Sequence, residues 1–379
     1  MSSAIKESVS TPMVNMGLAV KRLVYITLAC LLCACGKPPT PYSWNLPHSV
    51  PPPVVPNDNP MTIESVELGK ALFFDTALSG NHTTACSSCH DPALAFAEAS
   101  KVSVGANGDR LNRNALALVN VAYNATFTWA HNGLATIEEQ IMIPLFNEHP
   151  VEMGITGNEA LILKRLTTPN YQQMFNAAYG NEKPSMNHIV KALASYVRSL
   201  TSFNSAFDKY AYGGDDTALT TQQVKGLNLF FSERTECFHC HGGINLTQST
   251  IHAAQPLVLR PFHNTGLYNE DGEGGYPLID TGLMSVSHNP EHMGKFRAPT
   301  LRNIELTAPY MHDGSITSLE EVVDFYARGG NHREIKNRHR SPFIKGFVLT
   351  VEERNALVAF LESLTDTEFV EKHKNSTIL

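Results

Sequence analysis

The sequence has few charged residues and no dense basic run. Charged residues make up 17% of its 379 positions, the formal net charge is -7, and 42% of the residues are hydrophobic. Proteins that bind nucleic acid usually present a basic patch or stripe, so this composition argues against nucleic acid as a partner. The length and hydrophobic content predict a globular protein with room for two ordinary domains.

No hydrophobic run near the N-terminus is long enough to span a bilayer, which takes about 20 apolar residues. The apolar run at residues 23–34 follows Lys21 and Arg22 and ends in small residues, which is typical of a secretory signal. Residues 32–36 also resemble the lipobox of bacterial lipoproteins, in which Cys35 would carry the lipid. We expect residues 1–35 to be a signal peptide with this lipobox; export without a lipid is the alternative.

The protein is therefore expected in the periplasm or outer membrane of a Gram-negative bacterium, with a lipid at Cys35 as its only membrane contact. Proline is then concentrated in residues 36–60, where it fits a semi-extended tether.

Cysteine is scarce outside the signal region. Three of the seven cysteines lie there, and the other four form two pairs that are each followed at once by histidine. In this pattern two thiols bond to the vinyl groups of a porphyrin, and the histidine binds its iron. The two motifs consist of Cys86, Cys89 and His90, and of Cys237, Cys240 and His241. They predict two covalently bound haem c groups.

Zinc, a redox-active dithiol and a short disulfide are the other uses of such cysteine pairs. A redox dithiol needs no histidine after each pair, and zinc sites more often draw on a wider spread of ligands. Two repeats in an exported chain therefore favour haem.

The chain repeats itself around the two motifs. Residues 69–74 and 226–231 both read as an amphipathic helix leading into a small cytochrome domain, and residues 113–133 match residues 297–314. We expect an all-α fold of two duplicated cytochrome c-type domains, at residues 61–215 and 216–379, with the haems near the domain interface.

A capping-box pattern follows each repeat, at residues 136–139 and 318–321. Aligning the boxes places Pro144 opposite Tyr326. Proline cannot bind iron, and residues 91–130 hold no His or Met, so we expect an open coordination position at the first haem. The second haem would have His241 and Tyr326 as axial ligands, with Met311, Met293 or Met284 as alternatives to Tyr326.

From residue 69 to residue 364 the sequence resembles the di-haem cytochrome c peroxidase and MauG superfamily. The resemblance rests on the two haem motifs and on residues 299–303 (Pro-Thr-Leu-Arg-Asn) and 308–314 (Ala-Pro-Tyr-Met-His-Asp-Gly). Tyr326 resembles MauG rather than the peroxidases, which have Met there. Residues 41–47 and 148–154 look closest to the MbnH branch, whose members convert a Trp of the partner protein MbnP to kynurenine and accompany copper-handling genes.

The resemblance implies roles for further residues. Gln140, Pro144 and Glu152 would line the open pocket of the first haem, and Trp129 would relay electron holes between the haems. A calcium ion would lie between the haems, and its ligands would be the Asn114 side chain and the backbone carbonyls of Thr307 and Pro309.

Three functions follow for this chain. The first is a peroxidase-like oxidase that uses hydrogen peroxide, through high-valent iron shared between two haems, to oxidise a Trp of a partner. That partner would be a small exported, MbnP-like protein that could bind copper, and kynurenine the product. The alternative is a cytochrome c peroxidase supplied with electrons by small cytochromes or cupredoxins. A plain electron carrier is disfavoured, because carriers keep both axial positions filled.

Overall fold

The computed structural model describes residues 38–255, 257–331 and 333–375. Within them the secondary structure is entirely helical, with isolated β-bridges and no strand or sheet, which confirms the expected all-α class. None of the helices in this part of the chain is long and apolar enough to cross a membrane. The predicted signal peptide and Cys35 lie outside the described residues. The described residues from Thr40 onward form one compact unit.

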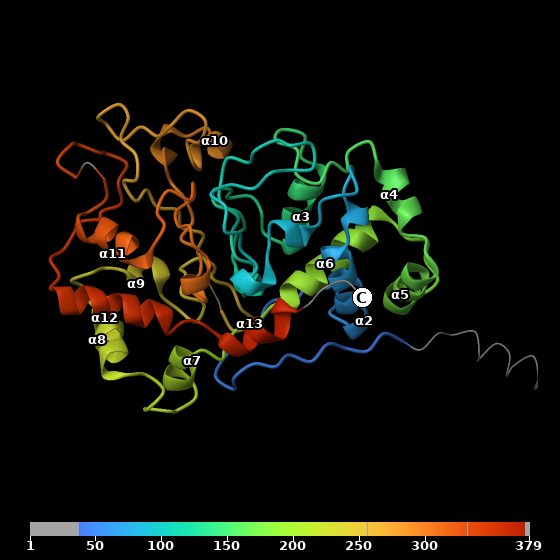
Figure 1. The fold of residues 1–379 in the computed structure, drawn as a ribbon, viewed down its shortest axis with the longest axis horizontal. Coiled ribbons are helices and arrows are strands. Elements are labelled where there is room, and N and C mark those ends of the chain that lie inside the picture. Colours follow the sequence, from blue (N-terminus) through green and yellow to red (C-terminus); the bar gives the residue numbers. More distant parts are fainter. Residues whose placement is uncertain (1–37, 256, 332, 376–379) are drawn as a thin grey trace, which may run out of the picture. The chain divides into compact units, whose positions relative to one another are not determined.

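The helices follow one another along the chain as Figure 1 shows. The α-helices are α2 (Ile63–Phe74), α3 (Ile137–Phe146), α4 (Glu159–Arg165), α5 (Pro169–Tyr179), α6 (Met186–Ser199), α7 (Ala206–Ala211), α8 (Thr221–Phe230), α9 (Phe238–His241), α10 (Met284–Ser287), α11 (Leu319–Ala327), α12 (Val351–Glu362) and α13 (Thr367–Lys374). Short 3-10 helices are η1 (Thr76–Leu78), η2 (Cys86–Ser88), η3 (Pro92–Leu94), η4 (Val121–Tyr123), η5 (Pro290–His292) and η6 (Ile304–Leu306).

The duplication appears as two equivalent helix crossings. Helix α2 packs against α6, and α8 packs against α12 (Figure 1). A Cβ added at Gly69 would lie 1.9 Å from the carbonyl oxygen of Ala192, and one added at Gly226 would lie 1.9 Å from that of Ala356. Each crossing is therefore close enough to require glycine.

Two hydrophobic cores correspond to the two halves. The first is built mainly from residues 61–200, and the second from residues 207–364 together with Ala130. Helix α13 departs from this order, because Phe369 packs in the first core. The predicted domain boundary between residues 215 and 216 stays a proposal. Helix α13, which follows the second half in sequence, packs with the first half.

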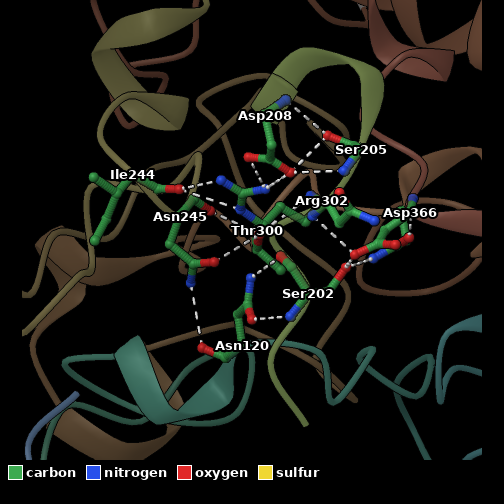
Figure 2. A network of polar contacts seen from close by, with 11 residues as sticks. Asn120, Ser202, Ser205, Asp208, Ile244, Asn245, Thr300, Arg302 and Asp366 are labelled. Carbon is green, nitrogen blue, oxygen red and sulfur yellow. Dashed lines mark hydrogen bonds and ion pairs between the residues drawn. The ribbon is translucent and has the colours of Figure 1, made fainter. Parts of the chain in front are cut away.

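Polar side chains join the two halves (Figure 2). Asn120 and Asn303 occupy matching positions in the repeat, and both have left-handed backbone conformations. The Asn120 side chain exchanges two hydrogen bonds with the backbone of Ser202, and Asn303 donates to the Ser202 hydroxyl. Nearby, buried Arg302 forms an ion pair with buried Asp208 at 2.8 Å. Ser202, which lies between the residues of the two cores, is therefore bonded to both Asn120 and Asn303.

Both helices predicted from capping boxes are present. Thr136 and Glu139 form a complete capping box at the start of α3. At the start of α11 Ser318 accepts a hydrogen bond from the Glu321 amide, whereas the Glu321 carboxylate accepts from Thr317 rather than from Ser318. Each helix begins one residue after its N-cap, so Pro144 and Tyr326 occupy the same position in α3 and α11.

Candidate functional site

The first haem motif borders a large cavity. Cys86, Cys89 and His90 line it, and it holds about 2060 Å³ of empty space, including space open to solvent. The Nδ1 atom of His90 lies 2.9 Å from the carbonyl oxygen of Phe96. A carbonyl accepts only from N–H, so Nδ1 carries the proton and Nε2 keeps a free lone pair for a metal.

The second motif borders a similar cavity, of about 1780 Å³ of empty space on the same measure. Cys237, Cys240 and His241 line it. The Nδ1 atom of His241 lies 3.1 Å from the carbonyl oxygen of Pro299 and 3.3 Å from that of Leu246. Burial lowers the pKa of His241 to about 4, so this imidazole is neutral at pH 7 and able to bind iron.

The cysteines do not resemble a redox-active dithiol. Burial raises the thiol pKa of Cys86 and Cys240 to about 12 and that of Cys237 to about 11. Reactive and zinc-binding cysteines need a stabilised thiolate, whereas uncharged thioethers fit apolar surroundings. Because the apolar surroundings suit thioethers and each histidine has a ring nitrogen free to bind iron, the residues present fit two covalently bound haems.

Gln140, Pro144 and Glu152 all line the first cavity, as the family resemblance implies. The Oε1 atom of Gln140 is buried without a hydrogen-bond partner in the described structure. Burial raises the pKa of Glu152 to about 7. The cavity thus offers a free amide oxygen and a carboxyl group that can gain or lose a proton at neutral pH.

Tyr326 lines the second cavity. Burial raises the pKa of its phenol, so the side chain would lose its proton only beside a strong positive charge such as ferric iron. Of the three alternatives, Met311 also lines this cavity, whereas Met293 and Met284 do not. Tyr326 and Met311 are therefore the ligand candidates that remain.

Trp129 lines both cavities, which places its indole in the wall that they share. Its Nε1–H donates a hydrogen bond of 2.8 Å to the carbonyl oxygen of Asn114. Trp44, the other tryptophan, packs on the first core and meets Tyr42 edge to face at 5.1 Å.

The three residues expected at the calcium ion also come together, since Asn114, Thr307 and Pro309 all line the second cavity. The Asn114 amide nitrogen donates to the carbonyl of Ser100. Within the described chain, no hydrogen bond reaches the Asn114 side-chain oxygen or the carbonyls of Thr307 and Pro309. Three oxygen atoms of the kind that calcium prefers are therefore without partners.

Three residues of these cavities had no role predicted from the sequence, namely Arg113, Asp280 and Arg297. Asp280, from the second half, lines the first cavity and forms a bidentate ion pair with Arg113, at 2.7 Å for both hydrogen bonds. Arg297 lines both cavities. The match between residues 113–133 and 297–314 included both arginines, and that shared position was the available signal. No sequence signal indicated that Arg113 pairs with Asp280, because the two residues lie far apart in sequence.

Comparisons with known proteins agree with this geometry. Residues 63–217 match the family described as di-haem cytochrome c peroxidase. The chain is 35% identical to cytochrome-c peroxidase IdrP1 of Pseudomonas sp. (strain SCT), over 84% of this chain and 85% of that protein. It is 34% identical to methylamine utilization protein MauG of Methylorubrum extorquens, over 84% of this chain and 82% of MauG.

Among solved structures, a MauG-like protein associated with microbial copper homeostasis matches with a TM-score of 0.83 and 42% identity. The match covers 87% of this chain and 97% of the other. Two cavities, each lined by its own Cys-x-x-Cys-His motif, define a di-haem c-type oxidoreductase. The chain belongs to the di-haem cytochrome c peroxidase family, which includes MauG, and so carries two haem c groups.

Proposed function

We propose that this protein uses hydrogen peroxide to oxidise a tryptophan of a partner protein to kynurenine by long-range electron transfer. When bound, the two haems supply the capacity to take oxidising equivalents from peroxide and to share them between two irons. Cys86 and Cys89 would attach one haem with His90 on its iron. Cys237 and Cys240 would attach the other, and His241 and Tyr326 would bind its iron.

The observation that carries the proposal is the contrast between Pro144 and Tyr326. The two residues occupy the same position in equivalent helices, and each lines its own cavity. Proline cannot bind iron and would leave room for peroxide at the first haem, whereas a tyrosine ligand would close the second. An anionic oxygen ligand favours higher oxidation states of iron, so the second haem is suited to storing oxidising equivalents.

The residues of the first cavity would handle the protons of peroxide. Glu152 can accept a proton from one peroxide oxygen and return it to the other, which assists cleavage of the O–O bond. The free amide oxygen of Gln140 can accept a hydrogen bond from peroxide and so orient it. Trp129, in the shared wall, would carry electron holes between the two haems.

Peroxide added to the purified diferric protein tests the proposal. We expect a long-lived near-infrared charge-resonance band, which reports charge shared by the two haems, and slow turnover with reduced cytochrome c. Tyr326→Met and Trp129→Phe should both lose the band while retaining two covalent haems by mass spectrometry. Rapid turnover with reduced cytochrome c, and no such band in the unmodified protein, would contradict the proposal.

The same experiment also tests the alternative, which is a cytochrome c peroxidase that takes electrons from small cytochromes or cupredoxins. The alternative is supported by the 35% identity to a relative that is itself named a cytochrome-c peroxidase. Met311 is the residue to examine in that case, because it also lines the second cavity.

The partner would be a small exported protein with an oxidisable tryptophan, MbnP-like and able to bind copper. The MauG-like structure associated with copper homeostasis supports this choice. Both proteins would meet in the periplasm or at the outer membrane, with this chain held through a lipid at Cys35. A calcium ion on Asn114, Thr307 and Pro309 would fix the wall between the cavities.

A further inference from the structure

One buried cation in the wall between the two cavities has no counter-charge. Several residues line both cavities, namely Asn114, Ala115, Leu116, Ala117, Asn124, Trp129 and Arg297. Of these shared residues in the described structure, Arg297 alone has a charged side chain. It is only 4% exposed to solvent.

Part of Arg297 holds the segment that carries Trp129. Its backbone N–H donates to the Trp129 carbonyl at 2.7 Å, and its Nε–H donates to the Thr128 carbonyl at 2.9 Å. Thr128 has a backbone φ of 59°, in the left-handed region that is unfavourable for a β-branched residue. Arg297 therefore fixes both carbonyls of a strained turn and, through them, the position of the indole.

The other end of the guanidinium remains unsatisfied. Its Nη1 atom is buried and has no hydrogen-bond partner, and no carboxylate of the described residues forms an ion pair with Arg297. The contrast with the other well-buried arginines is clear, since Arg302 is paired with Asp208 and Arg198 with Glu138. Burial lowers the pKa of Arg297 to about 10, so it stays charged at neutral pH. A buried charge without a partner is costly, which indicates that an anion completes this site.

We propose that Arg297 binds a propionate carboxylate of a haem through Nη1 while its Nε and backbone N–H hold the Trp129 turn. The anion must lie inside a cavity, because Arg297 is buried, and the propionates are the carboxylates that haem brings there. Arg297 thereby couples the seating of a cofactor to the position of the indole. This inference rests on haem binding alone and holds for either proposed activity.

The test compares three variants of the haem-loaded protein. Arg297→Gln removes the charge, and Arg297→Lys keeps it while losing the Nε–H. Arg260→Gln is the matched control, because Arg260 also donates through Nε to a backbone carbonyl, that of Ala125, but is exposed and lines neither cavity.

Redox titration should give a lower midpoint potential for at least one haem in Arg297→Gln, because loss of a buried positive charge favours the ferric form. The shift should be smaller in Arg297→Lys and absent in Arg260→Gln. The haem with the larger shift is the one whose propionate Arg297 binds. Equal shifts in the lysine and glutamine variants, or none in either, would overturn the proposal.

Resonance Raman spectroscopy provides a second readout that survives poor folding of the glutamine variant. The propionate bending band should move in Arg297→Lys, because the hydrogen bond to the carboxylate changes, and should not move in Arg260→Gln. An unmoved band in the lysine variant would mean that Arg297 holds the Trp129 turn only, or binds an anion from solution.

Discussion

Glu152 and Tyr326 differ in what burial does for each. Burial raises the pKa of Glu152 to about 7, so its carboxyl changes charge near neutral pH. The phenol of Tyr326 is pushed further from ionisation and depends on a metal to lose its proton. One group is therefore suited to moving protons, and the other to binding iron.

The rate of reaction with peroxide should reflect Glu152. If its carboxylate accepts the first proton, the rate rises with pH through about 7, because the deprotonated fraction grows there. Glu152→Gln should lose this pH dependence and react roughly 10²–10⁴-fold more slowly. Stopped-flow mixing with peroxide measures both effects.

Glu148→Gln is the control, because Glu148 is exposed and lines neither cavity. A glutamine variant at 152 that keeps the pH profile would assign the titration to another group.

At the scale of the helices, the two glycine crossings carry the duplication. The Cβ of an alanine at Gly69 or Gly226 would meet backbone atoms of α6 or α12, which cannot rotate away. We expect Gly69→Ala and Gly226→Ala each to lower the free energy of unfolding by about 1–3 kcal/mol, despite the better helix propensity of alanine.

Chemical denaturation of the haem-loaded protein checks this expectation. The exposed positions Glu67 on α2 and Gln222 on α8 provide alanine controls. If the glycine variants are as stable as these controls, the helices can move apart without a loss of unfolding free energy. The crossings would then not require glycine.

The helices also show what the sequence could predict. The starts of α3 and α11 were predictable because the residues that cap them are local, and the alignment of Pro144 with Tyr326 followed from counting along each helix. At α11 the Glu321 carboxylate accepts from the amide and hydroxyl of Thr317 instead, a contact that the capping-box pattern did not predict. The pairing of Arg113 with Asp280 was not predictable, since loop folding alone brings Asp280 to the first cavity, and the only signal for Arg297 was the position in the repeat that it shares with Arg113.

For the whole chain, the buried ion pair in the network of Figure 2 should contribute strongly to stability. Asp208 pairs with buried Arg302 and also accepts from the amide and hydroxyl of Ser205. Asp208→Asn leaves the guanidinium without a counter-charge and should cost about 3–5 kcal/mol of unfolding free energy.

An exposed ion pair gives the comparison. Lys336 and Glu273 lie 2.9 Å apart with both side chains largely in solvent. Glu273→Gln should change the unfolding free energy by less than about 1 kcal/mol. Similar values for the two variants in urea titrations would show that the buried pair contributes no more to stability than the exposed one.

Helix α13 affects the order in which the protein can be completed. Phe369 and His373 pack on Phe96, at ring distances of 6.0 and 5.6 Å, and the carbonyl of Phe96 is the one that orients His90. Helix α13 thus packs on the residue that orients the first iron ligand of the sequence. During synthesis, the first half cannot finish its own packing until the chain has been made beyond residue 373. Loss of α13 alone would therefore damage the half of the protein that was made first.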